Sequence, residues 1–248
     1  MVWLSAKLRG QSFKLPYDFL AKSANIKKMK KNNLFIWLSF IMLIFLPFSI
    51  NAQITDVDGN VYKIIQIGEQ IWMGENINVS SFRNGVPIPQ AKTKEEWDIS
   101  GDTGSPAWCY YENNPINGLT LGKLYNWHAI NDVRGFSPLG WHIPSDDEWT
   151  ELTDTQGGID KAGIKMKSMT MWMHYSNKRE EGAFEALPGG FRLRGRFSNG
   201  GVKGVRTYWW SSTKTWFRSL SYNEEGVSRD YCSKRTGMSV RCVKDNAN

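Results

Sequence analysis

The chain has 248 residues and a formal net charge of +7, and its basic excess lies at one end. Residues 1–52 hold eight Lys and Arg against one acid, which leaves 31 − 8 = 23 basic and 24 − 1 = 23 acidic residues in 53–248. A neutral domain lacks the basic surface that nucleic-acid binding requires, so the composition excludes nucleic acid as an expected partner.

Residues 29–52 have the pattern of a secretory signal peptide. Met29-Lys30-Lys31 gives a basic start, residues 34–50 are almost wholly apolar, and Ala52 is a small residue at the exit. The alternative is a retained anchor, because an apolar run of about 17 residues is at the short end of the spanning range. We favour cleavage before Gln53 with no stable membrane insertion afterwards. The expected location is secreted, periplasmic or at the cell surface.

The remaining chain has the size of one domain. Residues 1–28 precede the second Met and do not resemble a targeting signal, so we expect translation to begin at Met29 and residues 1–28 to be unstructured. Cleavage would leave residues 53–248, or 248 − 52 = 196 residues, which is enough chain for a substantial hydrophobic core.

The first half of 53–248 predicts short strands followed by two helices. Strands are expected at 62–67, 70–73 and 107–111, with an Asp58-Gly59 turn before them and a short helix around 95–97. Apolar residues at helical spacing predict the first of the two helices at 121–130. Ser145 and Glu148 form a capping box, which predicts the second helix from 146 to about 155.

The last third predicts strands again. They are expected at 184–187, 191–193, 208–213, 216–222, 227–232 and 238–243, with residues 223–226 forming the turn of a hairpin. Strands, then helices, then strands is the order of an α+β fold.

Seven short segments carry a family resemblance. They are DVDGNVY at 56–62, IWM at 71–73 with EN at 75–76, LYNW at 124–127, GWHIPSD at 140–146 with EW at 148–149, ALPGGFR at 186–192, YWWSST at 208–213 and SVRCV at 239–243. Together they resemble the Fibrobacter succinogenes major paralogous domain family, which is distantly similar to formylglycine-generating enzymes and C-type-lectin-like folds. The resemblance implies a compact C-type-lectin-like α+β domain with two helices and short twisted antiparallel sheets, exported by a bacterium of the Bacteroidota or a relative.

Three cysteines remain to be placed, Cys109, Cys232 and Cys242. Their spacing matches no zinc pattern, and an odd count leaves at least one thiol unpaired. Some relatives carry a Cys where this chain has Ser137, and it could bridge to Cys242. Without it, the resemblance favours Cys109 with Cys242, because relatives also carry Cys in those two segments. We expect no disulfide to be essential to the fold.

No catalytic, metal or cofactor site is predicted. The formylglycine-generating group uses a copper-binding cysteine site, but Cys242 lies in a structural segment and Cys232 has no matching motif around it. The three histidines lack the spacing of a zinc protease motif. The segment 56–60 resembles the start of a calcium loop, but Ile67 stands where the motif requires Glu.

The aromatic residues are the remaining candidates for binding. Ten Trp lie in 53–248, and we expect Trp127, Trp141, Trp149 and Trp209 to be core residues. The hairpin 216–231 is the predicted binding face, because Trp216, Arg218, Tyr222 and Arg229 offer stacking planes and charged donors. We therefore expect a secreted or surface-associated, non-enzymatic recognition domain for a glycan or protein. The alternatives are an enzyme related to the formylglycine generators and a structural extracellular protein.

Overall fold

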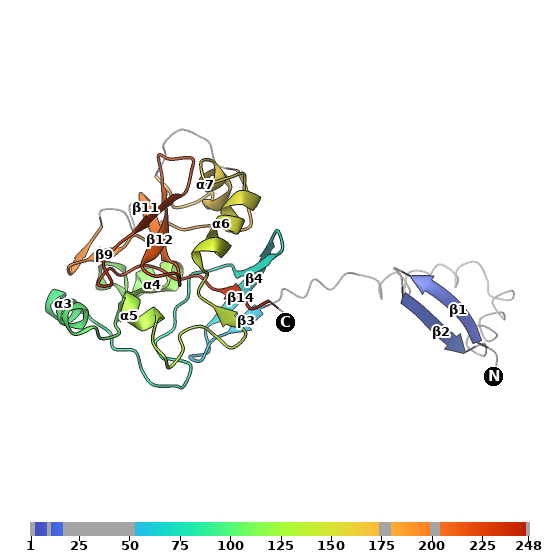
Figure 1. Ribbon diagram of the computed structural model, residues 1–248, viewed down its shortest axis with the longest axis horizontal. Coiled ribbons are helices and arrows are strands. Elements are labelled where there is room, and N and C mark those ends of the chain that lie inside the picture. Colours follow the sequence, from blue (N-terminus) through green and yellow to red (C-terminus); the bar gives the residue numbers. More distant parts are fainter. Residues whose placement is uncertain (1–2, 9–10, 17–52, 174–179, 199–203, 247–248) are drawn as a thin grey trace, which may run out of the picture. The chain divides into compact units, whose positions relative to one another are not determined.

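The computed structural model describes residues 3–8, 11–16, 53–173, 180–198 and 204–246, which form two compact units, Met1–Ile50 and Asn51–Asn248. In the first unit β1 (Trp3–Leu8) and β2 (Gln11–Pro16) pair as an antiparallel hairpin (Figure 1), although the sequence predicts no structure in 1–28. The predicted signal segment 29–52 and His174 lie outside the described residues.

A five-stranded sheet joins the beginning and the end of the second unit. Its order is β3 (Gln53–Thr55), β4 (Val61–Ile67), β5 (Gln70–Met73), β14 (Val243–Lys244) and β8 (Trp141–His142), with every neighbouring pair antiparallel. Because β3 and β14 share this sheet, the two ends of the unit lie close together (Figure 1).

The other sheets of the unit are smaller. A three-stranded antiparallel sheet consists of β11 (Arg206–Trp210), β12 (Trp216–Ser221) and β13 (Ser228–Tyr231). Two-stranded pairs are formed by β6 (Trp108–Cys109) with β7 (Leu124–Tyr125), and by β9 (Arg192–Leu193) with β10 (Arg196–Phe197). Alternation along β12 directs Arg218 and Leu220 to one face of the sheet and Phe217 to the other.

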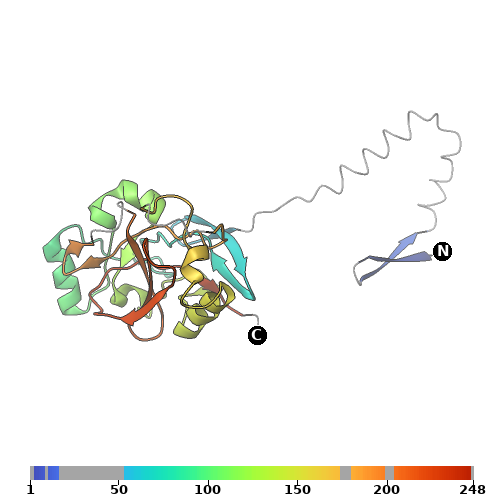
Figure 2. The same ribbon diagram turned by 90° about the horizontal axis from the view of Figure 1, so that it is seen from above.

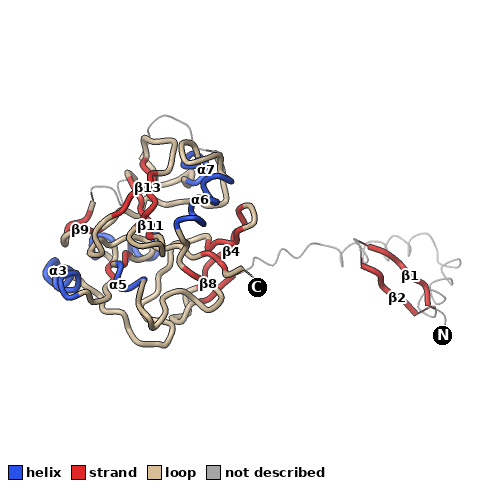
Figure 3. The backbone as a smooth tube through the Cα atoms, in the orientation of Figure 1, coloured by secondary structure: helices blue, strands red, loops and turns tan. Residues whose placement is uncertain are grey.

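Five α-helices lie among these strands in the described part of the unit, connected by long loops (Figure 3). They are α3 (Lys94–Thr103), α4 (Pro115–Leu121), α5 (Trp127–Ile130), α6 (Asp146–Thr155) and α7 (Ala162–Met166), with a 3-10 turn, η2 (Tyr111–Asn113). In both ribbon views α3 lies at one end of the unit, and α6 and α7 lie toward the other (Figure 2).

The helix predicted at 146–155 is confirmed, with the Ser145–Glu148 capping box formed as expected. The short helix expected around 95–97 is also present as part of α3, where Thr93 and Glu96 form a second capping box. Both helices begin at a local signal that the sequence encodes within four residues.

The single helix predicted at 121–130 is wrong. The chain ends α4 at Leu121, passes through Gly122 with φ 73°, and pairs Leu124-Tyr125 with β6 before α5 begins. Asn126 caps α5 by accepting a hydrogen bond from the Ala129 amide. Leu124 and Tyr125 of the predicted helical face are buried in a strand instead, so tertiary contacts override the local pattern.

The last predicted strand is also shorter than expected. Residues 238–242 make only single bridges, between Met238 and Tyr125 and between Ser239 and Trp209, and regular pairing begins at Val243. Residues 184–187 likewise form only one bridge, between Ala186 and Lys167, rather than a strand. The α+β class is confirmed, with more helices than the two that the sequence predicts.

The core is rich in tryptophan. The four tryptophans predicted to be core residues are all buried, and Trp149 and Trp209 are fully enclosed. Trp149 packs 4.9 Å from Trp72 and 5.9 Å from Trp209, measured between ring centres. Within the described ranges, no helix has the length and hydrophobicity needed to cross a membrane.

Candidate functional site

The hairpin predicted as a binding face does not present its four residues on one surface. Arg229 is exposed and its guanidinium lies 3.9 Å from the centre of the half-buried Trp216 ring. Tyr222 follows the end of β12 and packs against a buried hydrophobic cluster. Arg218 is fully buried. The prediction that Arg218 lies on the surface is therefore wrong, because its side of β12 faces the core.

Arg218 instead belongs to an ion cluster with Asp146, the first residue of α6. Its Nη1 lies 2.5 Å from Asp146 Oδ1, and Arg229 Nη2 lies 2.8 Å from Oδ2 of the same carboxylate. Burial by itself would raise the pKa of Asp146, but hydrogen bonds from Arg229 and Arg218 outweigh it and lower the pKa below its ordinary value. The two arginines thus hold the N-terminus of α6 against the sheet, which is a structural role.

His142 lies between two carboxylates. Its Nε2 is 2.7 Å from Glu148 Oε1 and its Nδ1 is 2.6 Å from Asp245 Oδ1. The hydrogen bond to Glu148 raises the pKa of His142 to about 8, with Asp245 adding to the effect and burial opposing it. Because both ring nitrogens donate to carboxylates, this imidazolium has no free nitrogen with which to act as a base. It connects β8, α6 and the end of the chain.

The three thiols are free and poorly suited to catalysis. Cys109 and Cys242 are buried in different hydrophobic clusters, so the predicted bridge between them is not made. Burial raises the pKa of Cys109 and Cys232 to about 11 and that of Cys242 to about 12. A reactive cysteine requires the opposite shift, toward a populated thiolate. The Sγ of Cys242 lies 3.5 Å from Ser137 Oγ, at the position where some relatives carry Cys.

The acidic loop at 56–60 is a turn that uses its own oxygens. The Asp56 carboxylate accepts hydrogen bonds from the amides of Asp58 and Asn60 and from the Tyr62 hydroxyl, at 2.6 to 3.0 Å. Gly59 takes φ 84° at its tip. Elsewhere in the part of the chain that the structure describes, no group of three His, Cys, Asp or Glu residues is placed to hold a metal ion.

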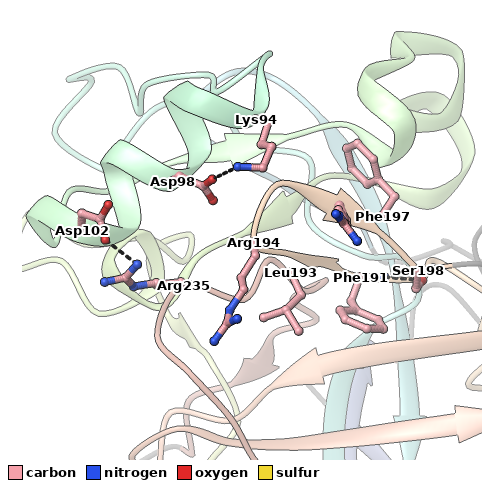
Figure 4. A pocket seen from close by; sticks show the side chains of 10 residues that line it. Lys94, Asp98, Asp102, Phe191, Leu193, Arg194, Phe197, Ser198 and Arg235 are labelled. Carbon is pink, nitrogen blue, oxygen red and sulfur yellow. Dashed lines mark hydrogen bonds and ion pairs between the residues drawn. The ribbon is translucent and has the colours of Figure 1, made fainter.

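An open cleft of about 690 Å³ lies between α3 and the β9–β10 hairpin, and we refer to it as the α3 cleft (Figure 4). The helix lines it with one face, since Lys94, Asp98 and Asp102 are four residues apart. The hairpin and its neighbours supply the other walls. The full lining is Lys94, Asp98, Asp102, Phe191, Leu193, Arg194, Arg196, Phe197, Ser198 and Arg235.

The α3 cleft carries more positive than negative charge. Four cationic side chains line it, against two carboxylates. Lys94 pairs with Asp98 at 2.5 Å, and Arg235 pairs with Asp102, as the dashed lines in Figure 4 show. Arg194 and Arg196 are exposed and have no carboxylate partner among the described residues. Two unneutralised guanidinium groups therefore face solvent at this cleft.

A second pocket of about 660 Å³ adjoins the α3 cleft, and we refer to it as the β12 pocket. The two cavities share the walls formed by Phe191, Leu193, Arg194 and Arg235. The β12 pocket adds an aromatic floor, where the Tyr208 and Phe217 rings lie 5.7 Å apart. The α3 cleft and the β12 pocket together form a groove on both sides of the hairpin.

One short sequence pattern could have pointed to this groove. Leu193-Arg194-Gly195-Arg196 reads as a two-residue turn with a charged side chain on each side of its glycine. Both central residues have positive φ, 46° for Arg194 and 68° for Gly195. The face of α3 opposite the turn could not be inferred, because about a hundred residues separate it from the hairpin in the chain.

The seven segments of the family resemblance lie mainly in the core. Asn76 Oδ1 accepts a hydrogen bond from Trp209 Nε1 at 2.8 Å, and the Trp210 ring donates to the Tyr125 carbonyl at 2.8 Å. Of the ten residues that line the α3 cleft, only Phe191 belongs to these segments. The shared motifs thus build the fold, and the groove is made almost entirely from residues between them.

Comparison with known proteins agrees with the resemblance seen in the sequence. The model of the Fibrobacter succinogenes major domain matches residues 65–244, which is 244 − 64 = 180 of the 248 residues. No curated protein matches the chain, and no solved structure does. The match covers both larger sheets from β5 onward and the five α-helices that the structure describes in the second unit. The chain therefore belongs to the Fibrobacter succinogenes major domain family.

Proposed function

We propose that this protein is an exported, non-enzymatic recognition domain that binds a glycan or protein through the groove formed by the α3 cleft and the β12 pocket. The observation that carries the proposal is the pair of exposed, unneutralised arginines beside apolar walls in an open cavity of ligand size. Cavities of 300–1,000 Å³ with a few polar groups among apolar side chains are typical binding sites.

Export is the first part of the proposal. The signal-like segment at 29–52 supports it, with its basic start, its apolar run and the small residue Ala52 at its end. N-terminal sequencing of the exported protein should begin near Gln53. A product that keeps residues 34–50 in the membrane fraction would contradict cleavage. The destination of the mature protein is secreted, periplasmic or cell-surface.

The finer fold classification is also a proposal. Short antiparallel sheets mixed with helices, and a chain whose two ends meet in one sheet, support a C-type-lectin-like architecture, which the family resemblance implies. An experimental structure that can be superposed on such folds would test this classification.

Binding is tested with two probes, a glycan array and a displayed random-peptide library, each applied to the purified 53–248 domain. The variant Leu193→Ser removes an exposed apolar side chain from the wall shared by the α3 cleft and the β12 pocket. Its matched control is Leu119→Ser, which alters an exposed leucine on α4, a helix that lines neither cavity.

Recognition through the groove predicts ligands that bind the wild type and the control but are weakened by Leu193→Ser. Ligands that bind all three proteins equally would place the site elsewhere. Failure of both probes to yield any ligand would instead favour a structural role for the protein.

A further inference from the structure

We infer that the groove takes an acidic peptide segment that carries apolar side chains, an inference that rests on the proposed function and specifies its ligand. The first argument is charge. The 53–248 chain is neutral, with 23 basic and 23 acidic residues, yet the two carboxylates of the α3 cleft are already paired with Lys94 and Arg235. Arg194 and Arg196 are therefore free to form ion pairs with negative charges on a ligand. Guanidinium groups bind carboxylates with two parallel hydrogen bonds.

The second argument is that the backbone of the turn that carries Arg194 is constrained. Arg194 has φ 46°, a left-handed conformation that non-glycine residues seldom adopt. The neighbouring Gly195 approaches α3 so closely that an added Cβ would lie 2.2 Å from Lys94 Cγ. The backbone of the two-residue turn is therefore fixed against the helix. A fixed turn does not have to be ordered when a ligand binds, which lowers the entropic cost of binding.

The third argument is the extent of the groove. The α3 cleft and the β12 pocket, about 690 and 660 Å³, are each large enough for a small ligand, and they share the wall that contains Leu193 and Arg194. A ligand that fills both must pass the hairpin. A linear chain with successive side chains meets this requirement, and a single compact molecule does not.

The fourth argument separates a peptide from a glycan. Sugar hydroxyls are usually matched by amide and carboxylate side chains around a flat aromatic ring. Aromatic rings line the groove, but its described walls contain no Asn or Gln, and both carboxylates are engaged in ion pairs. Beside the charged residues, the walls offer the apolar side chains of Phe191, Leu193 and Phe217. Such walls suit leucine or phenylalanine side chains beside acidic ones.

The test is selection of peptides from a displayed random library on the folded 53–248 domain, followed by fluorescence anisotropy with the synthesised consensus peptide. The inference predicts enrichment of Asp and Glu next to aromatic or aliphatic residues. It also predicts that affinity falls with ionic strength, and that the amide analogue, with Asn and Gln in place of the acids, binds about tenfold or more weakly.

Charge reversal locates the contact. Arg194→Glu with Arg196→Glu should weaken the acidic peptide by at least about tenfold. The control is Lys161→Glu with Lys165→Glu, which changes the net charge equally at exposed positions on and beside α7, outside the groove. The control should retain nearly wild-type affinity. Equal weakening by both pairs would show long-range attraction only and would overturn the inference.

The other possible results distinguish failure of the acidic-peptide inference from failure of the proposed recognition function. Peptides that are sensitive to Leu193→Ser but neutral or basic would overturn the acidic ligand and leave recognition by the groove in place. A labelled oligogalacturonate that binds in an Arg194-dependent way, while no peptide does, would show that the groove takes an anionic glycan, and would also overturn the inference. Failure of every glycan and peptide probe would remove the proposed function itself. Thermal unfolding of each variant, compared with wild type, confirms that the domain is folded.

Discussion

At the scale of single residues, Arg218 is a buried cation whose charge is balanced by the buried carboxylate of Asp146. The sequence of its strand is typical of a surface hairpin, yet Arg218 is enclosed. Its partner Asp146 lies 72 positions earlier in the chain, so the charge of Arg218 is neutralised only in the folded state. Alternation along a strand predicts which residues share one side of the sheet. It does not predict that a charged residue on the buried side will have an oppositely charged partner there.

Arg218→Ala should lower the free energy of unfolding by about 3–5 kcal/mol, since it removes one partner of a buried ion pair. Urea denaturation of the purified domain measures this. The comparison is Arg229→Ala, which removes the exposed partner of the same carboxylate and should cost much less. Similar losses for the two variants would mean that Arg218 is not buried as described.

His142 should make stability depend on pH. Its pKa in the folded protein is raised to about 8, from an ordinary value near 6.5, so its stabilising contribution is complete below about pH 6.5 and is lost as the pH rises through about 8. Thiols also ionise in the unfolded chain at alkaline pH, so the informative quantity is the difference between wild type and His142→Gln.

That difference in urea midpoint should be largest near pH 6 and should shrink by about pH 9. A constant difference across this range would show that the two carboxylates do not hold the proton on His142. His128 acts in the opposite direction: burial lowers its pKa, so its stabilising contribution is present above about pH 6.5 and is lost as the pH falls.

At the scale of elements, prediction succeeded where a signal is local. The helix at 146–155 starts at a capping box and ends where expected, so its position followed from four residues. The prediction of one helix over 121–130 failed because Gly122 ends α4 and Asn126 caps α5. The apolar residues between them pair with β6 instead. Helical spacing alone does not distinguish these outcomes.

Trp149→Ala tests how α6 is anchored. The side chain is fully buried against Trp72 and Trp209, and truncation of such a residue costs about 3–5 kcal/mol through lost burial and the cavity that remains. We expect unfolding or a severe fall in melting temperature. Trp216→Ala, at a half-buried position, should have a smaller effect. A Trp149→Ala protein that melts within a few degrees of wild type would refute this packing.

On the scale of the whole molecule, the loop before β8 and the segment before β14 lie close enough for a disulfide bond between them. Ser137 Oγ lies 3.5 Å from Cys242 Sγ across 105 positions of sequence. Ser137→Cys should therefore form a disulfide with Cys242 under oxidising conditions and stabilise the domain by about 2–4 kcal/mol.

Thiol titration of the denatured Ser137→Cys protein should then find two of its four cysteines free, and reductant should reverse the gain in melting temperature. Ser137→Ala is the control that alters the same contact without a new bond. Four free thiols after oxidation would contradict the proximity of these two positions.

The sequence by itself determined the family, the α+β class, the capped helices and the tryptophan core, because these follow from local caps, apolar spacing and short motifs whose residues pack on one another. Only the tertiary structure decided which cations are buried and where the groove lies. Arg218 and Arg194 are both arginines on hairpins, but one faces Asp146 in the core and the other faces solvent opposite α3. Burial and charge pairing depend on residues far apart in the chain, so no local pattern could have told these two arginines apart.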